Sequence, residues 1–204
     1  MNMIPLSVQS SHSIILLLGM LFFHVAEASP ESLENTIHQE PPFYSKAEKN
    51  RFITVGRYSG IDENKAVDIS NISLGKTYYV TDGIGLSGEI LAILARGKRD
   101  TIDANAEGIG GFFALRWHFI RGDKWSLFLN QGIGPVLFME EFPPGGTKLN
   151  ALIQYSLGVS AQLREATVLQ LGIRHIHISN GKGMVDNNPA YDGRGLYFDI
   201  TQQL

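Results

Sequence analysis

The chain has 204 residues and no cysteine, so it is long enough for one domain with a core but offers no disulfide framework and no thiolate chemistry. Its formal net charge is −3, with both signs mixed along the chain. That distribution provides no basic stripe, which argues against nucleic acid as a partner.

The first segment has the pattern of an export signal. An apolar run from Ile14 to Phe23 precedes the small-residue triplet Ala26-Glu27-Ala28, as in a hydrophobic region followed by a signal-peptidase site. We therefore predict that residues 1–28 are a signal peptide cleaved after Ala28. No Lys or Arg precedes the run, which leaves an uncleaved anchor as the alternative. The run is far shorter than the roughly 20 apolar residues that a spanning helix needs.

Residues 29–50 differ from the remainder of the chain. They contain Pro30, Pro41 and Pro42 among polar residues and have little apolar periodicity, so we expect a flexible lead-in. Over residues 51–204, strand-like segments recur at near-regular spacing, separated by turn residues. The eight expected strands lie around residues 52–56, 69–80, 88–96, 113–119, 125–136, 153–163, 168–179 and 196–200.

The segment 153–163 alternates with period two throughout, which indicates a strand with one apolar and one polar face. Segments 69–80 and 88–96 alternate less cleanly, because Lys76 and Glu89 interrupt their apolar faces. We predict that the apolar face of segment 153–163 points outward and its polar face inward. The outward set is Ile153, Tyr155, Leu157 and Val159, and the inward set includes Gln154, Ser156 and Ser160.

The connections between these segments favour a membrane barrel. Short links near residues 81–83, 121–124 and 164–165 alternate with longer links near residues 58–65, 97–107, 139–148 and 180–192. Short periplasmic turns, longer external loops and an even strand count are typical of outer-membrane barrels, and closure removes the edges that lipid would not tolerate.

The alternative is a soluble eight-stranded barrel or sandwich with its apolar face inside. Trp117 and Trp125 lie beside the same short link, where an aromatic girdle is expected. We therefore predict an all-β fold, an eight-stranded antiparallel transmembrane β-barrel, in the bacterial outer membrane.

Strand 168–179 carries the residues with a chemical function. Its parity places His175, His177 and Ser179 on the outward face. A His and a Ser two residues apart on a strand are neighbours, so the imidazole can act as general base on the seryl oxygen. Parity also places Asp192 outward on the adjacent last strand, where it could orient His177 as the third member of a triad. Asp186, in the intervening loop, is the alternative acid.

Other interpretations of these residues remain open. A His-x-Ser pair can be a simple hydrogen-bonding pair at a strand end. Two histidines on one face could bind a metal, but no additional ligand is evident, and nothing in the sequence indicates a cofactor. For His175 the sequence indicates no role beyond anchoring the barrel at the level of the lipid headgroups. Arg174 has inward parity and is expected to stabilise the lumen.

A longer string carries a family resemblance. The run from Arg174 to Gly181, followed by Asn188-Pro189 and an aromatic last strand, resembles the lipid A 3-O-deacylase (PagL-type acyloxyacyl hydrolase) family of outer-membrane barrels. The resemblance is specific from about Gly172 to Phe198. It implies an esterase that releases a 3-hydroxy fatty acid from lipid A, or lipopolysaccharide, in the outer leaflet.

The resemblance also assigns roles to individual residues. It implies that His177 is the base, Ser179 the nucleophile, and Asn180 with Gly181 the contributors to oxyanion or substrate binding. The best-known members carry a Glu at the start of the last strand, but no Glu follows Glu165 here. Asp192 must therefore replace it if a triad exists.

Competing functions follow from the same fold. A non-catalytic structural or adhesion barrel would have no use for a base beside Ser179. A small-molecule channel is disfavoured, because eight strands enclose an interior that side chains just fill. Lys182 in the last long loop is a candidate partner for a lipid phosphate. The sequence leaves open whether the barrel forms a homodimer.

Overall fold

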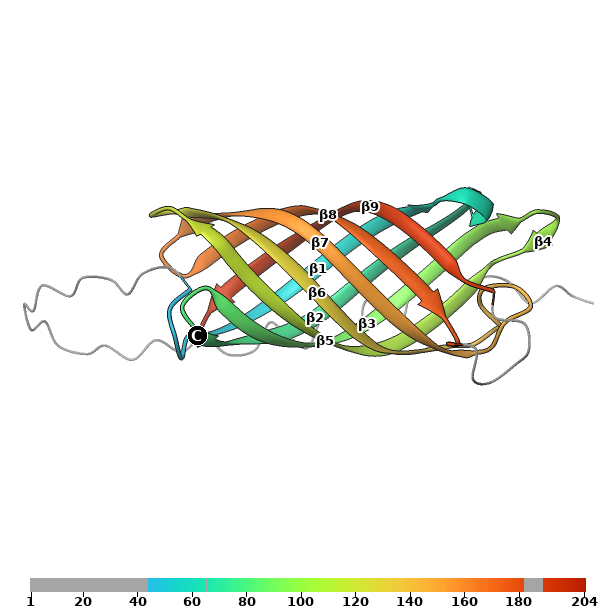
Figure 1. Cartoon of the computed structure of the whole chain (residues 1–204), viewed down its shortest axis with the longest axis horizontal. Coiled ribbons are helices and arrows are strands. Elements are labelled where there is room, and N and C mark those ends of the chain that lie inside the picture. The colour runs from blue at the N-terminus through green and yellow to red at the C-terminus, as the bar shows by residue number, and fades with distance from the viewer. Residues whose placement is uncertain (1–43, 65, 182–188) are drawn as a thin grey trace, which may run out of the picture. The chain divides into compact units, whose positions relative to one another are not determined.

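The computed structural model describes residues 44–64, 66–181 and 189–204, so the expected signal peptide and Asp186 lie outside the described residues. The described chain forms one closed antiparallel sheet, with strands inclined to the barrel axis (Figure 1). The elements are β1 (Lys49–Gly60), the 3-10 helix η1 (Asp62–Asn64), β2 (Val67–Thr81), β3 (Ile84–Arg99), β4 (Ile102–Asp103), β5 (Ala106–Arg121), β6 (Trp125–Phe138), β7 (Leu149–Arg164), β8 (Thr167–Ser179) and β9 (Tyr191–Gln203).

Eight long strands make up the circumference of the barrel. Successive long strands pair antiparallel, and β1 pairs with both β2 and β9, so no edge is left open. The two-residue β4 pairs only with the end of β3 and extends that hairpin at the end of the barrel away from the C-terminus (Figure 1). The predicted eight-stranded antiparallel barrel is confirmed. Within the described residues, no helix has the length and apolar character needed to cross a membrane.

The alternation in β7 has the predicted orientation. Gln154, Ser156 and Ser160 are buried inside the barrel, whereas Tyr155 and Leu157 are exposed on its outer surface. Because successive residues of a strand point to opposite faces, each strand of the barrel presents one face to the lumen and one outward. Most of the large exposed apolar side chains lie on outward positions, as a lipid-facing wall requires.

The middle of the lumen contains paired charges and hydrogen bonds. Arg116 Nη2 lies 3.6 Å from Asp199 Oδ2, and Thr54 Oγ1 and Thr201 Oγ1 donate to the same carboxylate. Glu89 also points inward and accepts a 2.8 Å hydrogen bond from Ser73 Oγ. Buried charges are stable only when paired and hydrogen-bonded. Asp199 meets that condition, whereas Arg116 Nε and Nη2 and Glu89 Oε1 have no hydrogen-bond partner among the described residues.

The lumen becomes apolar toward the end that carries the longer loops. There, inward side chains from all eight long strands form a single cluster. This explains why segment 88–96 alternates poorly, because both of its faces are apolar from Ile90 to Ala95. Members of the cluster are Val67, Ile69, Leu91, Ile93, Phe138, Leu152, Ile176, Ile178 and Tyr191.

The opposite end carries the short turns and is closed by the residues before β1. The backbone N–H of Gly83 donates to the Tyr44 carbonyl at 2.8 Å, and the N–H of Ala47 donates to the Tyr79 carbonyl at 2.9 Å. The buried Tyr44 ring stacks on His118 with centroids 3.6 Å apart. The last residues of the expected lead-in thus pack into the barrel, and β1 begins at Lys49.

Candidate active site

The outward face of β8 ends in two imidazoles and a hydroxyl. His175, His177 and Ser179 share outward parity, while Arg174 points into the lumen, where its guanidinium lies over the Tyr197 ring. Ser179 is the last residue of β8, at the end of the barrel with the longer loops. Strand period alone therefore brings the base and the nucleophile to one side of the wall.

His177 is hydrogen-bonded on both ring nitrogens. Its Nδ1 lies 3.0 Å from Asp192 Oδ1, and its Nε2 lies 3.0 Å from Ser179 Oγ. A carboxylate can only accept, so Nδ1 carries the proton that binds Asp192, and Nε2 is left to accept from the seryl hydroxyl. This is the protonation state in which an imidazole can remove a proton from a nucleophile.

The ladder between β8 and β9 sets the position of the carboxylate. His177 and Asp192 are direct partners in the antiparallel register, and directly opposed side chains lie within contact distance. Gly193 and Gly195 follow Asp192, but the pairing continues through both without a register shift. The parity extrapolated from the apolar residues of the last strand therefore places Asp192 beside His177.

His175 is the residue whose part in this cluster the sequence reasoning missed. Its Nε2 lies 3.3 Å from Asp192 Oδ1, the same oxygen that His177 contacts. The sequence contained a signal for this, because His175 shares the outward parity and lies two pairs further along the ladder, opposite Arg194. Among the described residues, no group of three or more His, Asp or Glu side chains is arranged to hold a metal ion.

The cluster lies in the wall without being sealed from its surroundings. Ser179 is 7% exposed, whereas the His177 and Asp192 side chains are 31% and 36% exposed. A substrate must therefore approach the seryl oxygen from outside the barrel, past the edge of His177. The lumen offers no route to it, because Ile176 and Ile178 fill the inner face of the same strand.

Asn180 and Gly181 continue the chain beyond the nucleophile. Asn180 lines a depression on the outer wall beside Ser179. Gly181 has φ +71°, a backbone conformation that favours glycine, and no atom of the described residues lies within 4 Å of where a Cβ would be. This left-handed turn at Gly181 lies two residues after the nucleophile, where β8 has ended.

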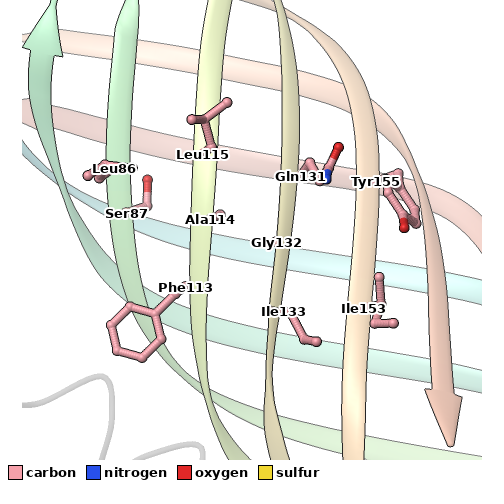
Figure 2. Close-up of a pocket in the computed structure, with 10 residues that line it drawn as sticks. All are labelled: Leu86, Ser87, Phe113, Ala114, Leu115, Gln131, Gly132, Ile133, Ile153 and Tyr155. Carbon is pink, nitrogen blue, oxygen red and sulfur yellow. The ribbon is translucent and has the colours of Figure 1, made fainter. Parts of the chain in front are cut away.

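The depression beside the site is mostly apolar. Its volume is about 480 Å³, and Ala151, one of the residues that line it, is the direct ladder partner of Ser179. A second depression of about 600 Å³ lies over β3, β5, β6 and β7, and Figure 2 shows the side chains that line it. Both depressions are lined by Phe113 and Ile133, so they adjoin. Together they form an apolar surface that leads from the nucleophile across the lipid-facing wall.

The fold and the site define a class of protein: a transmembrane β-barrel with a Ser-His-Asp cluster on its outer wall. A family model described as lipid A 3-O-deacylase (PagL) matches residues 66–201, which is more than half of the chain. The chain therefore belongs to the PagL lipid A 3-O-deacylase family, and it is an integral protein of the bacterial outer membrane. No curated protein matches the sequence.

Solved structures show the same fold at low sequence identity. The crystal structure of the outer membrane enzyme PagL is 19% identical, with a TM-score of 0.53, and the match covers 74% of this chain and 97% of that one. Neisserial surface protein A (NspA) is 10% identical, with a TM-score of 0.57 and coverage of 78% and 98%. The outer membrane protein OprG from Pseudomonas aeruginosa is 14% identical, with a TM-score of 0.50 and coverage of 78% and 97%.

Proposed function

We propose that this protein is an esterase that hydrolyses the 3-O-linked acyl chain of lipid A and releases a 3-hydroxy fatty acid. The observation that carries the proposal is the line of contacts from Asp192 through His177 to Ser179, with 3.0 Å at each step. That line lies on the lipid-facing wall of a barrel in a lipid A deacylase family. The catalytic roles of these residues are part of the proposal.

Acylation begins with proton transfer from Ser179 Oγ to His177 Nε2 as the seryl oxygen attacks the ester carbonyl carbon. Asp192 stabilises the imidazolium that forms. The tetrahedral intermediate then collapses, the bond to the sugar 3-oxygen breaks, and His177 returns the proton to that oxygen. The products of this half are a sugar with a free 3-hydroxyl and an acyl group on Ser179.

Deacylation repeats the sequence with water as the nucleophile. His177 takes a proton from the water, the hydroxide attacks the acyl carbonyl, and the proton passes to Ser179 Oγ as the acyl bond breaks. In both halves negative charge develops on the carbonyl oxygen, and donors near that oxygen lower the barrier. We assign this role to Asn180 and Gly181, because they directly follow the nucleophile along the chain and Asn180 borders the depression beside it.

The position of the cluster suits a substrate that stays in the membrane. The acyl chains of lipid A occupy the outer leaflet, so a nucleophile on the outer wall can meet the ester without extracting the lipid. The depression beside Ser179 is lined by Phe113, Ile133 and Leu149 among others, which suits an acyl chain, since burial of apolar surface favours binding. We propose that the chain to be removed lies there.

Asp192 differs from the Glu expected from the family resemblance. A shorter side chain could fail to reach the imidazole, but here Oδ1 lies 3.0 Å from His177 Nδ1. The direct pairing of residues 177 and 192 supports an aspartate in the role that the longer side chain has elsewhere, because it leaves little distance to bridge.

The direct test is incubation of the purified, detergent-folded protein with lipid A and measurement of the product mass. We expect lipid A to lose one 3-hydroxyacyl group and the free 3-hydroxy fatty acid to appear. The Ser179→Ala variant, prepared in parallel, should release no fatty acid. An unchanged lipid A mass under conditions where the barrel is folded would contradict the proposal. That result would favour a non-catalytic structural or adhesion barrel.

A further inference from the structure

His175 occupies a defined place in the polar cluster that the proposed reaction does not use. It lies on the outward face of β8, between its ladder partners Tyr155 on β7 and Arg194 on β9. Its Nε2 lies 3.3 Å from Asp192 Oδ1, and His177 Nδ1 lies 3.0 Å from the same oxygen. One carboxylate oxygen is therefore shared between two imidazoles.

The surroundings of His175 indicate which of its nitrogens carries the proton. Asp192 can only accept, so an attractive contact requires a proton on Nε2. The other nitrogen, Nδ1, is buried and has no hydrogen-bond partner among the described residues. A buried donor without a partner is costly. A neutral imidazole protonated on Nε2 avoids that cost, because its Nδ1 then carries no proton.

We infer that His175 is a positioning residue, which holds the carboxylate of Asp192 in the orientation that His177 needs. The inference rests on the proposed function, since it assigns Asp192 the role of the acid. The Asp192 side chain is 36% exposed, so a single hydrogen bond would leave its carboxylate free to rotate toward solvent. A second imidazole nitrogen, 3.3 Å from the same oxygen, restricts that rotation.

The geometry also limits what His175 can do. Ser179 lies four residues further along the strand, which corresponds to roughly 13 Å at about 3.3 Å per residue. At that distance His175 does not act on the seryl oxygen or on the ester carbonyl. Its effect must pass through Asp192, and this condition separates it from a residue that binds substrate.

Three consequences follow from a role through Asp192. Removing the Nε2 contact should lower kcat by about tenfold while KM stays unchanged, because losing one polar contact to a charged group has that order of effect on a barrier. A residue that keeps a donor at the same reach should restore activity, and Gln does so through its amide nitrogen. The loss should also vanish once Asp192 has been replaced.

The experiment compares His175→Phe with His175→Gln, each checked for folding by circular dichroism, and uses Ile173→Phe as the matched control. Ile173 is the next outward residue of β8 and is exposed, so the control places the same ring on the same face away from the cluster. We expect about a tenfold loss of kcat on lipid A for His175→Phe, near-parental turnover for His175→Gln, and little change for Ile173→Phe.

A second comparison places the same change in a different background. Asp192→Asn and Asp192→Asn combined with His175→Phe should have equal residual rates, because the positioned carboxylate is already absent. Independent losses that multiply in the double variant would overturn the inference, as would parental turnover by His175→Phe. Equal losses in His175→Phe and His175→Gln would also overturn it, because the donor would then be irrelevant.

A fluorophosphonate probe keeps this test separate from the lipid A assay. Its phosphorus is attacked by an activated seryl oxygen and fluoride leaves, so the labelling rate of Ser179 reports the His177 and Asp192 pair without lipid A. If the parent labels but leaves lipid A intact, the proposed substrate is wrong, and slower labelling of His175→Phe still supports the inference. If the parent does not label, or if it labels at the same rate as His175→Phe, the inference is wrong.

Discussion

His177 and Asp192 face each other across the β8–β9 ladder on the outer wall of the barrel, with Nδ1 and Oδ1 3.0 Å apart. The pairing is a consequence of register: two outward residues on adjacent antiparallel strands oppose each other wherever the ladder aligns them. The site is therefore built on regular strands for two of its members, and on the last residue of a strand for the third. Such positions hold side chains more precisely than loops do.

The first prediction concerns the nucleophile and the base. Ser179→Ala and His177→Ala should each lower lipid A deacylation by about a thousandfold or more, because each removes a group that takes part in bond formation. The double variant should be no worse than either single variant, since the two residues act as a unit. Product mass measurement under initial-rate conditions checks both statements. Turnover by Ser179→Ala within tenfold of the parent would exclude this serine as the nucleophile.

The second prediction concerns the depression beside the site. Ala151 is the ladder partner of Ser179 and lines that depression, so Ala151→Trp should fill the space proposed for the acyl chain. We expect a large loss of turnover on lipid A but a small loss on a short-chain ester such as an acetate, because only the longer chain needs the space. Equal losses on both esters would indicate damage to the nucleophile, and no loss on either would place the chain elsewhere.

The third prediction concerns the lumen. Asp199→Ala leaves the buried Arg116 without its carboxylate partner, which lies 3.6 Å away in the parent. Breaking a buried ion pair typically costs about 3 kcal/mol or more, so we expect a lower free energy of unfolding in urea. Asp103→Ala, on an exposed pair with Lys98, is the control and should change stability little. Comparable changes in the two variants would mean that the lumen network does not stabilise the barrel.

Much of the fold could be predicted from alternation, and the places where prediction was limited have a physical reason. Segment 153–163 showed its two faces because one is uniformly apolar and the other uniformly polar. The sequence of β3 shows no clear polar and apolar alternation, because Leu91 and Ile93 point into an apolar part of the lumen while Leu94 faces outward. Periodicity cannot mark a strand whose two faces are both apolar.

The ends of the strands were harder to predict from the sequence than the faces of the strands. β1 continues to Gly60 and β3 to Arg99, both inside segments expected to be loops. Antiparallel hydrogen bonds continue there irrespective of side-chain polarity, so composition did not mark the ends. The burial of Tyr44 was also missed, because nothing local in a Pro-containing polar segment indicates that one ring packs against His118.

The candidate site was the part that parity located best. His177 and Ser179 are two residues apart on one strand, so parity placed them on the same face. Counting back along the last strand placed Asp192 opposite His177. The contact of His175 was not foreseen, because it depends on how far a side chain leans along the ladder, which residue spacing does not reveal. The loop that holds Asp186 lies outside the described residues.

The fourth prediction concerns export. The apolar run before Ala26-Glu27-Ala28 leads us to expect cleavage after Ala28, so amino-terminal sequencing of the protein recovered from outer membranes should begin at Ser29. Ala28→Asp should block processing, because the peptidase requires a small residue there. Recovery of a full-length, membrane-bound chain from the parent would indicate an uncleaved anchor instead.

The last prediction decides which acid serves the base. Replacing Asp192 by Asn keeps the shape of the side chain but cannot stabilise the imidazolium that forms as Ser179 loses its proton. We expect turnover to fall by about a hundredfold or more with folding intact, although less than for Ser179→Ala, because His177 and the oxyanion donors retain part of the catalysis.

Asp186→Asn is the matched control, and it should keep parental turnover. If Asp186→Asn is inactive while Asp192→Asn matches the parent, the loop supplies the acid and the 3.0 Å contact in the wall is not the working one. If neither change matters but His177→Ala abolishes turnover, the enzyme works with a Ser-His pair alone. Kinetics on lipid A with all three variants at equal folded concentration distinguish these outcomes.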